Sequence, residues 1–135
     1  MTAQVPDGAS SGTLAVTGPG GTATSSGSFT VESLAAVKVN EVQTDGTTSQ
    51  DEFVELYNGG GTAADISGCK LVYRTASGTS DIVLATVPAS TTIPANGFYL
   101  FGGMDYAGAG PAVANQTFSA DLDATNGGLA LRYPS

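Results

Sequence analysis

Hydrophobic and polar residues alternate with a period of two along most of the chain, which predicts β-strands. After Gly68, for example, Cys69, Leu71 and Tyr73 fall on one face of an extended segment, and Lys70 falls on the other. No segment spaces its hydrophobic residues at i, i+3, i+4 and i+7 over ten or more positions, so no long helix is expected. We therefore predict an all-β fold in which one face of such a strand is core and the other is at least partly wet.

The predicted strands are short, and turns rich in glycine, proline and polar residues separate them. They cover residues 13–17, 28–31, 37–42, 53–57, 69–74, 82–87, 98–101, 117–122 and 128–133. The run Phe-Tyr-Leu-Phe at 98–101 has the hydrophobic density of a central strand buried on both faces. The turn at 58–61 contains three glycines, which can adopt a positive φ at any position. Many short strands at this spacing predict a β-sandwich.

Several motifs in the second part of the chain resemble one family. They are Val-Asn-Glu-Val at 39–42, Asp-Glu-Phe-Val-Glu-Leu-Tyr-Asn at 51–58, Asp-Ile-Ser-Gly-Cys-Lys-Leu at 65–71 and Ile-Pro-Ala-Asn-Gly-Phe-Tyr-Leu at 93–100. Together they resemble the lamin-tail domain over about residues 37–133. The resemblance implies an immunoglobulin-like antiparallel β-sandwich of the kind carried by bacterial surface and secreted proteins. It also implies a further strand after residue 133, which this sequence lacks, and it implies no reaction.

The first part of the chain resembles a second module. Residues 5–17, 19–26 and 29–31 resemble the last strands of an IPT/TIG domain, which is also immunoglobulin-like. Only this C-terminal part falls within residues 1–31, so we expect the chain to begin inside a domain of a longer protein, with Met1 as an expression start. Residues 32–36 are then a short linker, and residues 37–135 form the lamin-tail-like sandwich.

The charge of the chain argues against several classes of partner. The 135 residues include four basic and twelve acidic ones, which gives a net charge of −8 and a pI near 4.1. The basic residues are scattered along the sequence, so nucleic acid and anionic membrane surfaces are not expected partners. No run of eighteen apolar residues predicts insertion into a membrane. The N-terminus lacks the features of a signal peptide, so an exported parent protein would carry its signal upstream of Met1.

The sequence contains none of the common catalytic motifs. It has no histidine, which removes Ser-His triads, histidine-bound zinc and the commonest general base. It has no Gly-x-Ser-x-Gly elbow, and the glycines at 59–61 lack the lysine and the helix of a phosphate-binding loop. We expect neither an enzyme nor a tightly bound cofactor.

The acidic residues between positions 41 and 55 are the strongest chemical signal. Paired carboxylates can cleave glycosidic bonds, but nothing in the sequence places these in a cleft. Glu41 and Glu55 are instead predicted as partly buried structural carboxylates that accept backbone N–H groups or pair with Lys38 or Lys70. Calcium is a weaker hypothesis, because hard oxygen ligands cluster in the sequence although no Asp-x-Asp-x-Asp-Gly loop is present. The candidate calcium ligands are Asp45, Asp51, Glu52, Asp121 and Asp123.

The single cysteine and the tyrosines are predicted to be structural. Cys69 cannot form an internal disulfide, and its place on the face of Leu71 and Tyr73 predicts a buried thiol. The five tyrosines of the chain could stack on sugars, but alternating tyrosines in strands more often pack in the core or across strands.

Two functions remain open from the sequence. The first is a non-catalytic structural or interaction module that spaces, anchors or docks neighbouring domains or other surface proteins. The second is a carbohydrate-binding accessory module of a secreted hydrolase, with calcium as an optional aid. Both predict an extracellular or cell-surface location in a bacterium. An open sheet edge would also recruit residues 14–31 as an added strand, within the chain or in a strand-exchanged homodimer.

Overall fold

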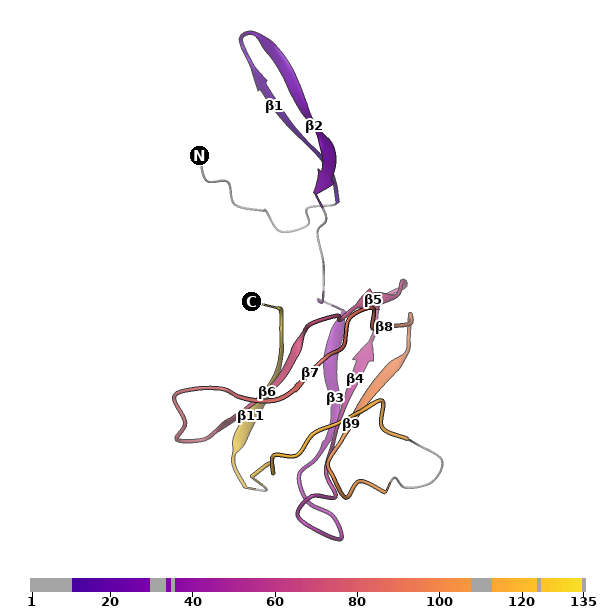
Figure 1. Ribbon diagram of the computed structural model, residues 1–135, viewed down its shortest axis with the longest axis vertical. Coiled ribbons are helices and arrows are strands. Elements are labelled where there is room, and N and C mark those ends of the chain that lie inside the picture. The colour runs from indigo at the N-terminus through magenta and orange to yellow at the C-terminus, as the bar shows by residue number, and fades with distance from the viewer. Residues whose placement is uncertain (1–10, 30–33, 35, 108–112, 124, 135) are drawn as a thin grey trace. The chain divides into compact units, whose positions relative to one another are not determined.

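The computed structural model describes residues 11–29, 34, 36–107, 113–123 and 125–134, and every regular element in them is a β-strand. Figure 1 labels the strands as they are named below. They are β1 (Gly12–Gly18), β2 (Gly21–Phe29), β3 (Val37–Gln43), β4 (Phe53–Asn58), β5 (Ala64–Asp65), β6 (Lys70–Thr75), β7 (Ile82–Thr86), β8 (Thr92–Ile93), β9 (Phe98–Gly102), β10 (Gln116–Thr117) and β11 (Gly127–Arg132). The all-β prediction is therefore confirmed.

The chain divides into two compact units, Met1–Ser33 and Leu34–Ser135. Most of the predicted linker at 32–36 lies outside the described residues, and so do residues 5–10 and 30–31 of the IPT/TIG resemblance.

The first unit contains an antiparallel hairpin. β1 pairs with β2 from Gly12 opposite Phe29 to Gly18 opposite Gly21, with a bulge between Thr13 and Ala15. β2 is longer than the predicted strand at 28–31, because the ladder continues to the Pro-Gly turn at 19–20. Hydroxyl groups support the ribbon, and the Ser25 hydroxyl accepts a hydrogen bond from the bulged Leu14 N at 3.0 Å.

The second unit is built from two main sheets. One has four strands in the order β10-β9-β4-β3, the other has three in the order β11-β6-β7, and β5 and β8 form a small separate ribbon (Figure 1). All pairs are antiparallel except β9 with β10, which run parallel over two residues. That short parallel pair is a local exception within the predicted antiparallel sandwich.

The core lies between the two main sheets. Leu56 of β4, Phe101 of β9 and Leu71 of β6 are each 0 % exposed and belong to one hydrophobic cluster. Leu129 and Leu131 of β11 pack against this cluster, because they lie opposite Tyr73 and Leu71 in the ladder. The inward face of every main strand is thus set by the period-two alternation of the sequence.

The prediction that residues 98–101 are buried on both faces is wrong. Tyr99 and Phe101 are 7 % and 0 % exposed, but Phe98 is 53 % exposed and Leu100 is only partly buried. No layer of the described residues covers the outer face of β9 there. On this outer face Phe98 instead forms a cross-strand aromatic contact. It lies opposite Tyr57, and the two ring centroids are 4.9 Å apart.

The predicted strand at 117–122 is a two-residue strand followed by a closing loop. After Thr117 the loop turns inward, and Phe118 and Leu122 are 3 % and 5 % exposed in the core. These two side chains cover one end of the sandwich.

The three glycines after Asn58 are not among the described residues with positive φ. The more constrained glycine is Gly127, at the start of β11, where φ is +157° and a Cβ would overlap the Tyr73 ring. The Tyr73 hydroxyl donates to Asn126 O at 2.9 Å and accepts from Asp123 N at 3.2 Å. Gly127 therefore permits the close approach by which Tyr73 fixes the loop before β11.

We expect Gly127→Ala to lower the free energy of unfolding by about 1–3 kcal/mol, because the added methyl group must displace the buried Tyr73 ring. Gly128→Ala is the matched control, since nothing lies within 4 Å of a Cβ there. It should change stability by less than about 0.5 kcal/mol. Urea unfolding of both variants checks this, and equal losses in the two would contradict it.

Candidate functional site

Among the described residues of the second unit, Glu52 has a buried carboxylate and is 1 % exposed. It accepts a hydrogen bond from Leu122 N at 2.8 Å and so ties the closing loop to the start of β4. Burial raises the pKa of Glu52 above 4.5, and the negative charges of Asp121 and Asp45 add to the rise, while the bond from Leu122 opposes it. Glu52 is enclosed rather than open to a substrate, so its role is structural.

The candidate calcium ligands Asp45, Asp51 and Asp123 each accept hydrogen bonds from nearby loop residues. Asp45 accepts from Gly46 N at 2.9 Å, and Asp51 accepts from Thr47 N at 3.0 Å. Asp123 accepts from the backbone N and the hydroxyl of Thr125, and these hydrogen bonds hold its pKa below the usual value. Within the part of the chain that the structure describes, no group of three or more His, Cys, Asp or Glu side chains could hold a metal ion. Asp45, Asp51 and Asp123 therefore act as local turn caps.

Glu41 and Glu55 lie directly opposite each other in the ladder between β3 and β4. Glu55 is partly buried and accepts from Asn40 Nδ2 at 2.7 Å, so its partner is a side-chain amide rather than a backbone N–H or a lysine. Glu41 was expected to be partly buried, but it is exposed, because β3 is an edge strand with a bulge between Val39 and Glu41. Cys69 is 2 % exposed and belongs to the core cluster.

The outer face of the four-stranded sheet carries two aromatic contacts, which we call the aromatic face. Tyr57 and Phe98 form a tilted pair, and Phe53 and Tyr106 form an edge-to-face pair with centroids 5.7 Å apart. Glu55 lies between them along β4. The other tyrosines are placed differently. Tyr73 and Tyr99 are buried in the core, where desolvation raises the pKa of Tyr99, and Tyr133 is 50 % exposed.

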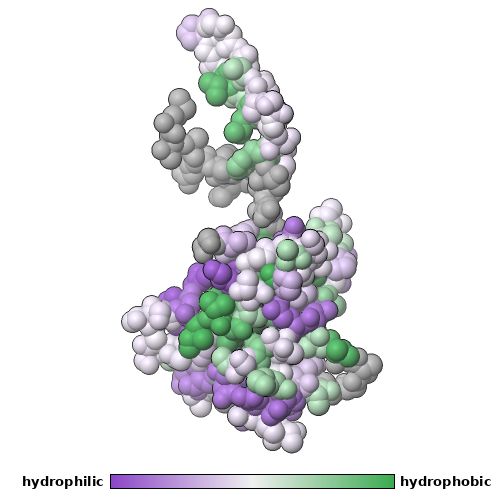
Figure 2. Space-filling view, viewed as in Figure 1, coloured by the Kyte–Doolittle hydropathy of each residue, from purple (hydrophilic) through white to green (hydrophobic). Residues whose placement is uncertain are grey.

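The outer face of the three-stranded sheet is apolar in the middle and basic around it. We call it the basic face and define it by Lys70, Val72, Arg74, Asp81, Val83, Ala130 and Arg132. The ladder sets this arrangement, because Lys70 lies opposite Arg132 and Val72 lies opposite both Ala130 and Val83. A groove of about 220 Å³ runs over Val72 and Ala130 and is open at Gly128. Figure 2 shows hydrophobic surface gathered over β6, β7 and β11, with hydrophilic surface beside it.

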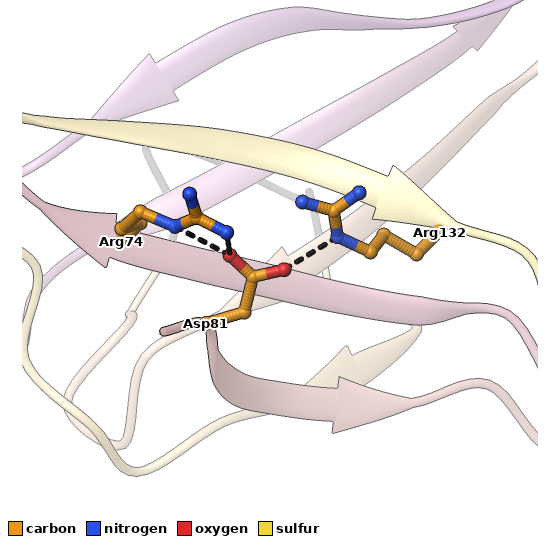
Figure 3. A network of polar contacts seen from close by, with 3 residues as sticks. All are labelled: Arg74, Asp81 and Arg132. Atoms are coloured by element: carbon orange, nitrogen blue, oxygen red, sulfur yellow. Dashed lines mark hydrogen bonds and ion pairs between the residues drawn. The ribbon is translucent and has the colours of Figure 1, made fainter. Parts of the chain in front are cut away.

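A three-residue ionic network bounds this groove. Arg74 donates to Asp81 Oδ1 from Nε at 2.8 Å and from Nη2 at 2.6 Å, while Arg132 Nε donates to Asp81 Oδ2 at 2.5 Å (Figure 3). These hydrogen bonds, that of Arg132 first, hold the pKa of Asp81 below its usual value. The Arg74 and Arg132 side chains are 46 % and 54 % exposed, so both guanidinium groups remain open to solvent.

Sequence reasoning missed the basic face because it treated the basic residues as scattered. The alternation of Lys70, Val72 and Arg74 already placed two cations on one wet face. What the sequence did not show is the pairing of β11 with β6, which adds Arg132 to them. The structure thus brings three of the four basic residues of the chain onto one sheet face.

The two facing sheets around one core define an immunoglobulin-like β-sandwich. The family model of the lamin tail domain matches residues 30–132, so the chain belongs to the lamin tail domain family. That family is an immunoglobulin-like, non-enzymatic domain that typically serves as an interaction module. No curated protein and no solved structure matched the chain. The match begins after β2, so the IPT/TIG resemblance of residues 5–31 stays a prediction.

The described residues contain no helix with the length and apolar character needed to cross a membrane.

We expect the free energy of unfolding of the Glu52→Gln variant, measured relative to that of the natural protein, to increase as the pH rises from about 4 to about 7. Because burial raises the folded-state pKa above 4.5, the folded chain holds the Glu52 proton more tightly than the unfolded chain does. That stabilisation is complete below 4.5 and is lost as the pH rises through the folded-state pKa. Glutamine keeps an acceptor for Leu122 N and carries no charge.

Urea unfolding at a series of pH values measures this difference. Glu41→Gln is the matched control, since it removes an exposed carboxylate and should shift stability by less than about 0.5 kcal/mol. A stability difference between Glu52→Gln and the natural protein that stays flat or falls with pH would contradict the expectation.

Proposed function

We propose that this chain is a non-catalytic structural or interaction module of a larger secreted or cell-surface bacterial protein, in which it docks or spaces neighbouring domains. The observation that carries the proposal is the basic face, an exposed sheet surface that combines an apolar groove with two half-exposed arginines. Membership of a family of immunoglobulin-like interaction domains supports it.

The apolar part of this face favours a protein partner. The outward residues of an antiparallel sheet that meets water are normally polar. Here Val83 of β7 is 52 % exposed and lies opposite Val72, which lines the groove together with Ala130. Contiguous exposed apolar surface of this kind marks interaction sites, and arginine is enriched at the centre of such interfaces. Docking of a second domain would remove this apolar surface from water.

The bacterial extracellular setting rests on the resemblance of residues 37–133 and on composition. Only 12 % of the residues are charged, and the surface is correspondingly rich in hydroxyl and amide groups.

In the first unit, Leu14, Val16 and Phe29 of the hairpin are 59 %, 65 % and 40 % exposed. Such apolar positions suit a hairpin that pairs with further strands, either of an IPT/TIG-like module or of a second copy in a strand-exchanged homodimer.

The docking proposal predicts where a neighbouring domain binds. The domains that flank this one in its parent polypeptide, produced separately and added in trans, should shift amide resonances in β6, β7 and β11. Val83→Glu should abolish these shifts, because it places a charge in the apolar contact. Val113→Glu is the matched control, since Val113 is 83 % exposed and lies outside this sheet. Shifts confined to β3, β4 and β9, or no shifts with any flanking domain, would contradict the proposal.

A second candidate function, carbohydrate binding, is favoured by the aromatic face. Phe98 is 53 % exposed and packs on Tyr57, whose hydroxyl donates to Asn96 Oδ1 at 3.2 Å. The amide of Asn40 and the carboxylate of Glu55 lie farther along the same sheet. An exposed aromatic ring beside amides and a carboxylate is the combination that stacks on a sugar ring and accepts or donates to its hydroxyl groups.

Carbohydrate binding predicts saturable and specific signals on a glycan array, with a calcium-assisted mode losing them in EDTA. Phe98→Ala should then remove binding by deleting the stacking surface, whereas Phe29→Ala, at an exposed phenylalanine of the hairpin, should leave it unchanged. In either function we expect no turnover of glycans, esters or phosphodiesters. Turnover abolished by Glu55→Gln in a folded variant would refute the non-catalytic proposal, and the absence of saturable binding would refute the carbohydrate one.

A further inference from the structure

The charges of this chain are distributed unevenly over its surface. The chain has a net charge of −8, yet three of its four basic residues lie on the basic face, where Asp81 is the carboxylate that the described residues place among them. The fourth basic residue, Lys38, is on β3 of the other sheet. The basic face is therefore a local positive surface on an acidic protein, and its potential attracts an acidic partner and orients it.

The ionic network is not neutral by itself. Asp81 lies between Arg74 and Arg132 and bridges them with its two oxygens (Figure 3). One carboxylate balances one of the two guanidinium charges, and each guanidinium group has five N–H donors, of which Asp81 engages only some. Since both arginines are about half exposed, at 46 % and 54 %, a second carboxylate can approach them from solvent.

The groove beside the network has an apolar side that suits an aliphatic group. Val72, Leu129 and Ala130 line its apolar side, and the three residues of the ionic network line it as well. Its open end lies at Gly128, where nothing lies within 4 Å of a Cβ. None of the residues that line it is aromatic, so it offers no stacking surface for a base or a sugar. The remaining acidic residues of the chain would also repel the dense phosphates of a nucleic acid. A polypeptide supplies a carboxylate and an aliphatic side chain side by side.

We infer that the basic face binds an acidic polypeptide segment, whose carboxylate joins the Arg74–Asp81–Arg132 network while its neighbouring aliphatic side chain enters the groove over Val72 and Ala130. This inference rests on the docking function proposed above and names the chemistry of the partner. The specificity comes from the combination, because the carboxylate alone would meet any exposed cation and the aliphatic group alone any apolar surface.

Fluorescence anisotropy with a labelled peptide of alternating glutamate and valine tests the inference. This peptide should bind saturably, and peptides of alternating lysine and valine or of glutamate and serine should bind at least about tenfold more weakly. Arg132→Gln should weaken binding of the glutamate–valine peptide roughly tenfold, because it removes a charge-assisted contact. Lys38→Gln, the same charge change on the other sheet, should weaken it less than about twofold.

A second variant tests the groove without touching the arginines. Gly128→Leu fills the open end of the groove with a side chain, so it should weaken peptide binding roughly tenfold while the ionic network stays in place. Thermal unfolding of each variant confirms that the sandwich is folded before binding is compared.

Each of the following results would overturn the inference. Equal losses in Arg132→Gln and Lys38→Gln would mean that only the overall charge matters. Equal affinity for the glutamate–serine peptide would remove the groove from the site. Polygalacturonate binding as tightly as the peptide, with the same dependence on Arg132, would make the ligand an acidic polysaccharide. If the peptide fails while a flanking domain still shifts β6, β7 and β11, only the acidic chemistry of the partner is refuted and the docking function stands.

Discussion

The burial of alternate side chains between two sheets is the constraint on which the rest of this structure depends. Leu56, Leu71 and Phe101 come from three strands of the two sheets, and all are 0 % exposed. Burial of each such side chain contributes about 1.5–3 kcal/mol, which fixes the face that each strand turns inward. Since a strand has only two faces, this choice also decides which residues point outward. The aromatic face and the basic face are thus consequences of the core.

The ends of the sandwich are closed by polar groups as well as by apolar ones. Phe118 and Leu122 cover one end, and the Glu52 carboxylate holds Leu122 N in place beneath them. Burial disfavours the charged form of the Glu52 carboxyl group and so raises its pKa. Holding the loop at this end of the sandwich therefore requires an unfavourable burial of a polar group. Asn58 has a similar role on β4, since its buried amide donates to Thr62 O and Ile93 O and accepts from Gly60 N. Glu52, just before β4, therefore holds the loop at Leu122, and Asn58, at the end of β4, holds the turn that follows it.

Much of the fold follows from the sequence because the alternation of hydrophobic residues is a local signal. The strands at residues 37–42, 53–57 and 128–133 agree with β3, β4 and β11 to within one residue at each end, and the family match at 30–132 agrees with the resemblance at about 37–133. The two-residue strands β5, β8 and β10 are too short to show any period. The enclosure of Glu52 was also missed, since it depends on a loop seventy residues further along the chain. Phe98 shows the opposite error, because local hydrophobic density does not reveal whether another layer covers a strand.

The basic face shows why function is harder to predict than fold in a β-sandwich. Its composition depends on the register between β6 and β11, and a shift of one residue would move Arg132 to the opposite face from Lys70 and Arg74. The register in turn is fixed by Leu129 and Leu131, which must lie opposite Tyr73 and Leu71 to reach the core. The position of the arginines is therefore set by Leu129 and Leu131, which pack against the core. Substitutions of these two leucines that shift the register would move Arg132 away from Arg74, so the proposed binding surface depends on the packing of the core.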